Sequence, residues 1–261
     1  MKNVVTYREA DGSIIKFETH PHLASTLELA REYANDSECP DRYVVFTDKR
    51  TKLKSSERDL EVESESGIYM SCIFRPSFFP SQASLLSAMS AAAMVSGLES
   101  HADKKLGIGW VSDIYCDNTK IGGVSIEGKL DSYNAYEYII VTFTCTISQD
   151  HFPLKLSDMI KKVFDTDNSS INMILARDIL TKFLRFYINL KNSSKFMSIY
   201  TEKFALRGKK VKHLENEKWR TRRVIGVDSK TGALILDNGK DSVITVTSPT
   251  LVTTPKKLKS H

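Results

Sequence analysis

Alternating hydrophobic and polar positions predict that the chain begins with two strands followed by a helix. Val4–Arg8 and Ser13–Glu18 alternate on either side of an Asp-Gly pair, which is typical of a tight hairpin turn. From Thr26 to Ala34 apolar residues recur at helical spacing, and Ser25 or Thr26 is suited to the N-cap. We therefore expect a hairpin and then a helix over residues 26–34.

The next segment combines buried strands with a helix rich in small residues. Tyr43–Thr47 and Ile68–Arg75 are β-branched and aromatic runs that predict core strands. Asp48–Ser66 lies between them and carries many charges without apolar periodicity, which predicts a long surface loop or a polar excursion. Ser81 is placed to cap a helix over Gln82–Leu98, which consists largely of Ala, Leu and Met.

Three further strands and a second long helix follow. The strands are expected at Gly107–Ser112, Lys120–Glu127 and Tyr136–Ser148, and the last two are long enough to pair as a hairpin. Asn172–Asn189 shows apolar residues at i, i+3 and i+4 spacing, which indicates an amphipathic helix. The sheet is therefore predicted to be mostly antiparallel.

The pattern changes again in the last quarter of the chain. From Gly208 onward, short β runs such as Arg223–Val227, Ala233–Asp237 and Val243–Val246 alternate with turn signals, which predicts a small barrel. We thus predict an α+β fold with a mostly antiparallel mixed sheet covered by helices in residues 1–200. A small all-β barrel domain is expected in residues 201–261.

Composition narrows the class of protein. With 261 residues and 41% hydrophobic content the chain can bury a substantial core, and its apolar runs are far shorter than the roughly 20 residues that cross a bilayer. The mixed charges at the N-terminus do not form a signal peptide. The cysteines show no CxxC pairing and no nearby histidine cluster, so we expect free thiols in the cytoplasm, no membrane association and no metal site.

The net charge of +5 is concentrated in the last third of the chain. This asymmetry permits an acidic partner, but a solvated basic face is the simpler interpretation because aromatic residues are sparse among the cations. Binding of nucleic acid is therefore not expected. The cations concerned include Arg207, Lys209, Lys210, Lys212, Lys218, Arg220, Arg222 and Arg223.

Several short motifs, in a fixed order, resemble the catalytic and C-terminal domains of biotin–protein ligases. The resemblance extends from about Phe17 to Thr253 and includes turn glycines of the Src-homology-like barrel of that family. The family's STN, GNLYxS, KWPND and KxxG motifs are similar to Ser25-Thr26-Leu27, Gly67-Ile68-Tyr69-Met70-Ser71, Gly109-Trp110-Val111-Ser112-Asp113 and Lys120-Ile121-Gly122-Gly123.

This resemblance implies a biotin/lipoate ligase-like fold and an ATP-dependent ligase. Such enzymes join the carboxylate of biotin to the α-phosphorus of ATP, with magnesium as companion ion, and pass the acyl group to a lysine of a biotin carboxyl carrier domain. Biotin or a related acyl acid is thus the expected substrate. The resemblance leaves open whether two copies of the chain associate as a homodimer.

The resemblance also assigns roles to single residues. Lys120 is the implied catalytic residue, which meets the biotin carboxyl and the acyl-phosphate region, whereas its alternative interpretation is an exposed lysine at a strand end. Gly122-Gly123 beyond it permits close approach of a ligand to the backbone. Ser25 and Thr26 are the implied donors to the ureido ring, in addition to capping a helix. The implied biotin-binding set is Ser25, Thr26, Tyr69, Ser71, Gly122 and Gly123.

The nucleotide site departs most from the family pattern. Lys54 and Arg58 align with two arginines of the family's GRGRxGR loop, but the segment contains no glycine and is also consistent with a solvated loop of mixed charge. Trp110 and Asp113 remain from KWPND, and Thr146 stands where the GxGxN motif has its asparagine. The implied nucleotide-binding set is Lys54, Arg58, Trp110, Asp113 and Thr146.

Two hypotheses remain open at this point. One is a biotin–protein ligase with diverged motifs, and the other is a catalytically inactive relative, a pseudoenzyme that keeps the scaffold to bind a ligand or a protein. The first is supported by Lys120 and the second by the losses at several motifs, including Leu27 in place of the STN asparagine. A third interpretation treats the basic barrel as a nucleic-acid-binding module, with strong salt dependence as its signature.

Overall fold

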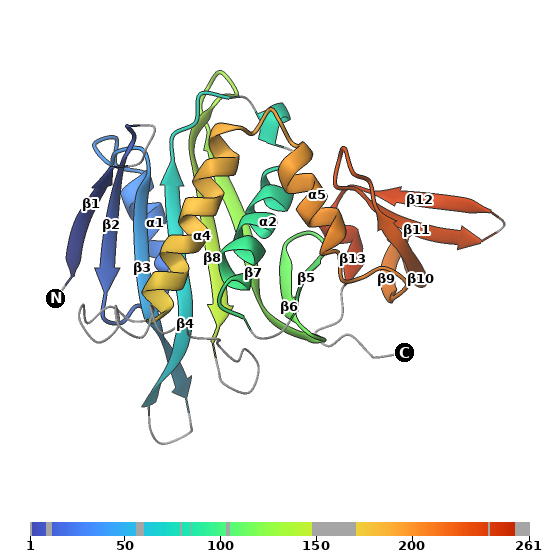
Figure 1. Ribbon diagram of the computed structural model, residues 1–261, viewed down its shortest axis with the longest axis horizontal. Coiled ribbons are helices and arrows are strands. Elements are labelled where there is room, and N and C mark those ends of the chain that lie inside the picture. The colour runs from blue at the N-terminus through green and yellow to red at the C-terminus, as the bar shows by residue number, and fades with distance from the viewer. Residues whose placement is uncertain are drawn as a thin grey trace. The chain divides into compact units, whose positions relative to one another are not determined.

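The computed structural model describes residues 2–8, 12–55, 60–78, 80–83, 85–102, 105–147, 171–239 and 241–253 (Figure 1). Of residues 52–55, 60–65, 81 and 82 it describes the backbone alone. The chain divides into two compact units, which are described separately. The first comprises Met1–Ala83, Val124–Asp150 and Leu156–Arg177, and the second Ser84–Gly123, His151–Lys155 and Asp178–His261.

A large mixed sheet supplies most of the strands. Its hydrogen-bonded order is β1-β2-β3-β4-β8-β7-β6-β5, and β2 pairs with β3 in parallel while the other described pairs are antiparallel. The α+β class predicted from the sequence is thereby confirmed. The strands are β1 Asn3–Arg8, β2 Ile14–His20, β3 Tyr43–Ser55, β4 Leu60–Phe74, β5 Leu106–Gly109, β6 Asp113–Cys116, β7 Thr119–Leu130 and β8 Tyr136–Thr146.

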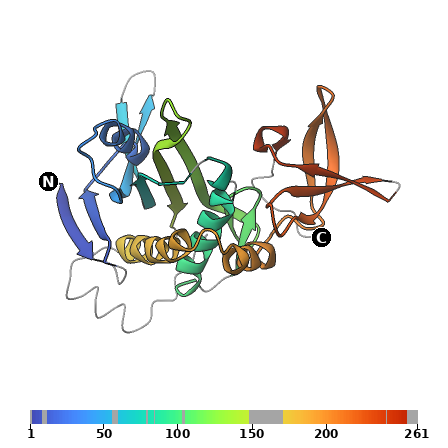
Figure 2. The same cartoon turned by 90° about the horizontal axis from the view of Figure 1, so that it is seen from above.

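The core of the first unit lies under helix α1, Thr26–Ala34. Ala30 and Ala34 of this helix pack with Val45, Ile73 and Ile140, which come from three neighbouring strands. Figure 2 shows α1 against one face of these strands. The small alanine side chains let the helix approach the sheet closely, and burial of this apolar surface fixes the position of the helix. The bounds of α1 agree with the prediction.

The prediction of a loop or polar excursion over residues 48–66 was wrong. β3 and β4 extend into this segment as a long antiparallel hairpin, with β3 ending at Ser55 and β4 beginning at Leu60. The register sets Arg50 opposite Glu65, Lys52 opposite Glu63 and Lys54 opposite Glu61. Opposite charges on paired strands favour pairing, so here the strands are encoded by alternating charge rather than by apolar periodicity.

The helices after β4 depart from prediction at two points. Residues Pro80–Ala83 form a short 3-10 turn, and α2 spans Leu86–Glu99, so the predicted start at Gln82 was too early. Proline favours such a turn because it lacks a backbone donor. Gly97 lies inside α2, where a Cβ atom would come within 2.7 Å of the backbone of Ile179 in α4, Ile171–Ile188. It therefore permits close helix packing. Helix α5, Ser194–Glu202, was not predicted.

A second sheet of five strands lies in the last part of the chain. Its order is β12-β11-β10-β9-β13, and its apolar side includes Val211, Val224, Leu234, Leu236 and Val246. This arrangement is compatible with the small barrel that was predicted. The strands are β9 Lys210–Glu215, β10 Lys218–Val227, β11 Leu234–Gly239, β12 Ser242–Val246 and β13 Val252–Thr253, with a short 3-10 turn at Pro249–Leu251.

The prediction of free thiols agrees with the structure. All four cysteines are buried free thiols. Within the described residues, no helix combines the length and apolar character needed to cross a bilayer. Within the same residues, no group of three or more His, Cys, Asp or Glu side chains is arranged to hold a metal ion.

Candidate functional site

A cavity of about 190 Å³ lies in the first unit, and we call it the hydroxyl cavity. The loop leading into α1, the first residues of α1, and strands β3, β4, β7 and β8 contribute to its wall. Arg50 is the one charged side chain of its described lining, and no carboxylate occurs there. That lining consists of Leu23, Ala24, Ser25, Thr26, Leu27, Thr47, Arg50, Tyr69, Ser125, Thr142 and Thr144.

Three buried hydroxyl groups form a row beside this cavity. The Oγ1 atom of Thr26 lies 2.9 Å from Oγ of Ser71, which in turn lies 2.9 Å from Oγ1 of Thr142. Ser71 and Thr142 stand opposite each other in the β4–β8 ladder, and the start of α1 supplies Thr26. All three residues are buried. Because a buried hydroxyl without a partner is costly, this mutual bonding stabilises a polar wall inside the unit.

An arginine and a tyrosine stack at the same cavity. The guanidinium carbon of Arg50 lies 4.9 Å from the centroid of the Tyr69 ring, and Tyr69 is itself buried. Such a cation–π contact orients the guanidinium along the aromatic face. Arg50 also lies next to the loop that enters α1, since the backbone N–H of Thr51 donates to the carbonyl of Leu23 at 3.0 Å. The cavity therefore combines hydroxyl donors with one oriented cation.

The first turn of α1 borders the cavity. Ser25, one of the two predicted candidates, is the N-cap, and its Oγ accepts a hydrogen bond from the backbone N–H of Glu28 at 3.2 Å. The amino end of a helix carries a partial positive charge from its backbone N–H groups. This end and Arg50 both favour a ligand that presents acceptor oxygens.

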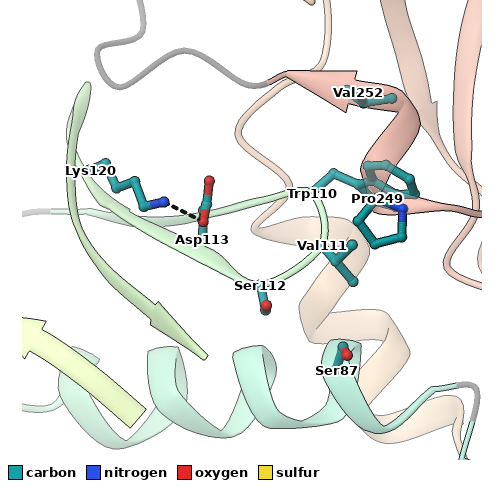
Figure 3. A pocket seen from close by; sticks show the side chains of 8 residues that line it. All are labelled: Ser87, Trp110, Val111, Ser112, Asp113, Lys120, Pro249 and Val252. Carbon is teal, nitrogen blue, oxygen red and sulfur yellow. Dashed lines mark ion pairs between the residues drawn. The ribbon is translucent and has the colours of Figure 1, made fainter. Parts of the chain in front are cut away.

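A second cavity, of about 380 Å³, lies in the second unit, and we call it the Lys120 cavity (Figure 3). Lys120 of β7 and Asp113 of β6 point toward each other, with Nζ 2.6 Å from Oδ1. The lysine side chain keeps 40% of its surface exposed and the aspartate 22%, so a ligand can reach both. The described lining consists of Ser87, Trp110, Val111, Ser112, Asp113, Lys120, Pro249 and Val252.

The wall of the Lys120 cavity is held by hydrogen bonds and close backbone packing. The indole N–H of Trp110 donates to the carbonyl of Gly232 at 2.9 Å, and the Tyr200 hydroxyl donates to the carbonyl of Val111 at 2.8 Å. Burial, with a smaller contribution from Asp113, raises the pKa of Tyr200. A Cβ atom on Gly123 would stand 2.9 Å from the carbonyl oxygen of Ser112. Glycine at 123 therefore allows β7 to approach the 110–113 turn.

The structure brings some of the predicted site residues together and leaves others apart. Ser25, Thr26 and Tyr69 line the hydroxyl cavity, with Ser71 bonded to Thr26. Trp110, Asp113 and Lys120 line the Lys120 cavity, and Gly122 pairs with Ile114 on the same β6–β7 ladder as Gly123.

The remaining predicted residues lie elsewhere. Thr146 ends β8 opposite Gly67 and is not among the described residues that line either cavity. Lys54 is in β3 and its side chain is outside the described part of the chain, as is the whole of Arg58.

Sequence reasoning missed Arg50, Thr142 and Thr144 as lining residues. The alternation of threonine with Phe143 and Cys145 in β8 was an available signal, because every second residue of a strand faces the same side. For Arg50 no local signal existed, since it occurs in a run of charged residues.

Comparisons with known proteins give relatives in sequence and a common fold. No family model matches the chain. The bifunctional ligase/repressor BirA of Bacillus spizizenii is 27% identical over 152 residues, which are 58% of the present chain and 46% of that protein. The chain thus spans about half the length of this curated relative.

Solved structures extend the likeness over nearly the whole chain. A biotin protein ligase from Aquifex aeolicus superimposes with a TM-score of 0.62 at 17% identity, covering 93% of this chain and 97% of that one. A structure of biotin protein ligase from the same organism in complex with biotin and ATP gives a TM-score of 0.60 at 18% identity, with 90% and 96% covered. At these identities the structures establish the fold.

Proposed function

Since this chain is related in sequence and in fold to the biotin protein ligases, we propose that it activates biotin with ATP and transfers the biotinoyl group to a carrier lysine. In the first step a biotin carboxylate oxygen attacks the α-phosphorus of ATP and pyrophosphate leaves. In the second step the amine of the carrier lysine attacks the acyl carbon, AMP leaves, and the amine loses a proton.

The hydroxyl cavity carries this proposal. A ureido ring presents a carbonyl oxygen that accepts hydrogen bonds and N–H groups that donate them, and hydroxyl groups can do both. Ser25 and Thr26 line the cavity together with Tyr69, and the hydroxyl of Ser71 is hydrogen-bonded to that of Thr26. Leu23 and Leu27 supply an apolar wall for the sulfur-containing ring of biotin. A neutral polar ring with an apolar flank therefore suits this lining.

Lys120 is the group that we assign to the adenylation step. Bringing a carboxylate to a triphosphate concentrates negative charge, and a positioned cation stabilises the charge that develops at the transferred phosphorus. Lys120 lines a cavity with Trp110 and Asp113, and its Nζ is exposed enough to exchange the aspartate for an anionic ligand. Gly122 and Gly123 provide the backbone beside it without side chains.

The remaining nucleotide contacts are part of the same proposal. We assign Lys54 and Arg58 to the phosphates, as point charge and bidentate fork respectively, and Thr146 to the nucleotide through its hydroxyl. Magnesium is proposed to arrive with ATP, because Mg²⁺ keeps several waters and uses few protein ligands. Trp110 and Asp113, which line the Lys120 cavity, are assigned to the nucleotide.

The partner and the compartment complete the proposal. The acceptor is a biotin carboxyl carrier domain, and two copies of the chain are proposed to associate through a sheet edge, which sedimentation can test. The free buried cysteines fit a reducing compartment, so we place the protein in the cytoplasm.

The test is direct. The purified chain is titrated calorimetrically with biotin and then with ATP and magnesium, and the mixture is analysed by mass spectrometry for biotinoyl-AMP and for a biotinylated carrier lysine. Binding of biotin, followed by formation of the adenylate and of the biotinylated carrier, is the expected result.

Thr26→Val, which keeps the volume of the side chain and removes its hydroxyl, should weaken biotin binding about tenfold. Biotin binding without any adenylate would instead favour an inactive relative, and no binding would overturn the proposal.

A further inference from the structure

The β9–β10 hairpin of the second unit presents basic and aromatic residues on one face. Its register sets Trp219 opposite Leu214, Thr221 opposite Lys212 and Arg223 opposite Lys210. Since side chains alternate between the faces of a strand, these residues share one side, which we call the outer face. The outer face consists of Lys210, Lys212, Leu214, Trp219, Thr221 and Arg223.

Burial separates the outer face from the opposite one. Trp219 is 51% exposed, and Lys210, Lys212 and Arg223 are exposed as well. On the opposite face, Val211 is buried in the apolar core of the unit. The cations and the indole therefore stand in solvent together.

The acidic side chain of the two strands, Glu215, lies on the face opposite the outer face. Glu215 is the sole acidic residue of β9 and β10 apart from the turn, and its Oε2 lies 2.7 Å from Arg222 and 3.4 Å from Arg220. The hydrogen bond from Arg222 comes first among the causes that lower the pKa of Glu215. Lys210, Lys212 and Arg223 form no ion pair with any residue in the described part of the chain. The outer face is thus uniformly cationic around one exposed tryptophan.

We infer that the outer face of this hairpin binds single-stranded nucleic acid. A base stacks on Trp219, and neighbouring phosphates meet Lys212, Arg223 and Lys210. Aromatic rings set among cations are the common device of proteins that hold single strands without reading their sequence. Same-face positions repeat about every 6.7 Å along a strand, which spaces the contacts for an extended chain.

An acidic protein segment is the competing partner. It would satisfy the cations, but its carboxylates offer no planar face to stack on the indole of Trp219, whereas a nucleobase does. The basic charge alone did not favour nucleic acid, because aromatic residues are sparse among the cations along the sequence. The register changes that assessment by placing Trp219 on the same face as the cations. This inference is independent of the proposed ligase activity.

Binding is measured by fluorescence anisotropy of the full chain with labelled oligo(dT) and oligo(U) over a series of salt concentrations. Three phosphate contacts should give a slope of about −2 in a plot of log affinity against log salt, and Lys212→Ala should reduce its magnitude by about 0.7. Trp219→Ala should weaken binding about tenfold or more, whereas Trp219→Phe should retain most of it. Quenching of indole emission should come from Trp219, since Trp110 is buried.

A matched control separates a binding face from general charge. Arg220→Ala removes the same charge from the same strand, but Arg220 lies on the opposite face beside Glu215. It should leave affinity within about twofold, whereas Arg223→Ala should weaken it severalfold. Equal losses in the two variants, or absence of binding at low salt, would overturn the inference. The inference would also be overturned if a poly-glutamate peptide bound as tightly as the oligonucleotides and its affinity were unchanged by Trp219→Ala, since that result identifies an acidic protein partner. Unfolding midpoints establish that each variant is folded.

Discussion

The hydroxyl cavity and the Lys120 cavity both have polar groups in their walls, and these groups are satisfied in different ways. In the first, Thr26, Ser71 and Thr142 satisfy one another as neutral groups inside the unit. In the second, a cation and a carboxylate face each other at the surface of a larger space. A neutral buried row is suited to holding shape, and an exposed ion pair is suited to exchanging partners.

Under the proposed function, the hydroxyl cavity serves recognition of biotin and the Lys120 cavity serves the adenylation step. Removing a member of a buried row leaves partners unsatisfied, so its cost should appear in both stability and binding. Removing one member of an exposed pair costs little stability, because water solvates the other member. Variants in the two cavities should thus differ in which measurement they change.

The largest effect is expected for Lys120→Ala. Loss of a positioned cation should lower the rate of biotinoyl-AMP formation by about 10² to 10³ fold, because it stabilises the developing charge, while biotin affinity changes little. Single-turnover mass analysis measures the rate. Lys129→Ala is the control, since Lys129 lies in the same strand and pairs with Glu137 at 2.9 Å. Equal losses in the two variants would remove the special role of Lys120.

Ser71→Ala should have the next largest effect. It removes the middle of the hydroxyl row, so unfolding free energy should fall by about 2 kcal/mol and biotin affinity about tenfold. Urea denaturation and calorimetry measure the two quantities. Ser90→Ala is the matched change, since Ser90 is equally buried but its Oγ donates to the carbonyl of Leu86 within α2. If the Ser71→Ala protein lost stability but bound biotin normally, the hydroxyl row would have no role in biotin recognition.

A moderate effect is expected for Arg50→Met. Loss of the cation over Tyr69 should weaken biotin binding about three- to tenfold, whereas Arg50→Lys should retain part of the affinity. Titration calorimetry measures the biotin affinity of both variants. Arg177→Met is the control, because its guanidinium stacks 4.6 Å from the Tyr7 ring centroid and is not among the described residues that line the cavity. An unchanged affinity in Arg50→Met would exclude the guanidinium from ligand binding.

The smallest effect concerns pH. Because burial raises the pKa of Tyr200, the folded protein favours its neutral form. This group therefore contributes stability below about pH 10, and the contribution is lost as the pH rises above the unfolded value. Tyr200→Phe should flatten the alkaline decline of the unfolding midpoint. Tyr133→Phe, at an 84% exposed position, should not, and an identical pH profile in all three proteins would contradict the assignment.

Local signals predicted the fold well where the determinants are adjacent in sequence. Ser25 caps α1 and Thr26 begins it because capping depends on the next three residues. The hairpin over residues 48–66 was missed because its strands are matched by charges seven to fifteen residues apart. The early start assigned to α2 followed from its composition, which does not distinguish a 3-10 turn from the first helical turn.

The candidate site could be predicted only in part. Ser25, Thr26 and Tyr69 were found through a motif resemblance, and the structure places them around one cavity. The alternation in β8 indicates that Thr142 and Thr144 share a face, but the contact of Thr142 with Ser71 depends on the pairing of β4 with β8, which the sequence of either strand does not specify. Arg50 needed the pairing of its strand with the loop before α1.

The hydroxyl row has no fixed polarity. In each of its two contacts either oxygen can be the donor, so the three protons can all point one way along the row or all the other way. Rotation of hydroxyl groups, with no heavy atom displaced, therefore changes whether the end of the row offers a proton or a lone pair. The same row of hydroxyl groups can therefore donate to a carbonyl oxygen or accept from an N–H group. The ligand selects the direction of the hydrogen bonds along the row when it binds.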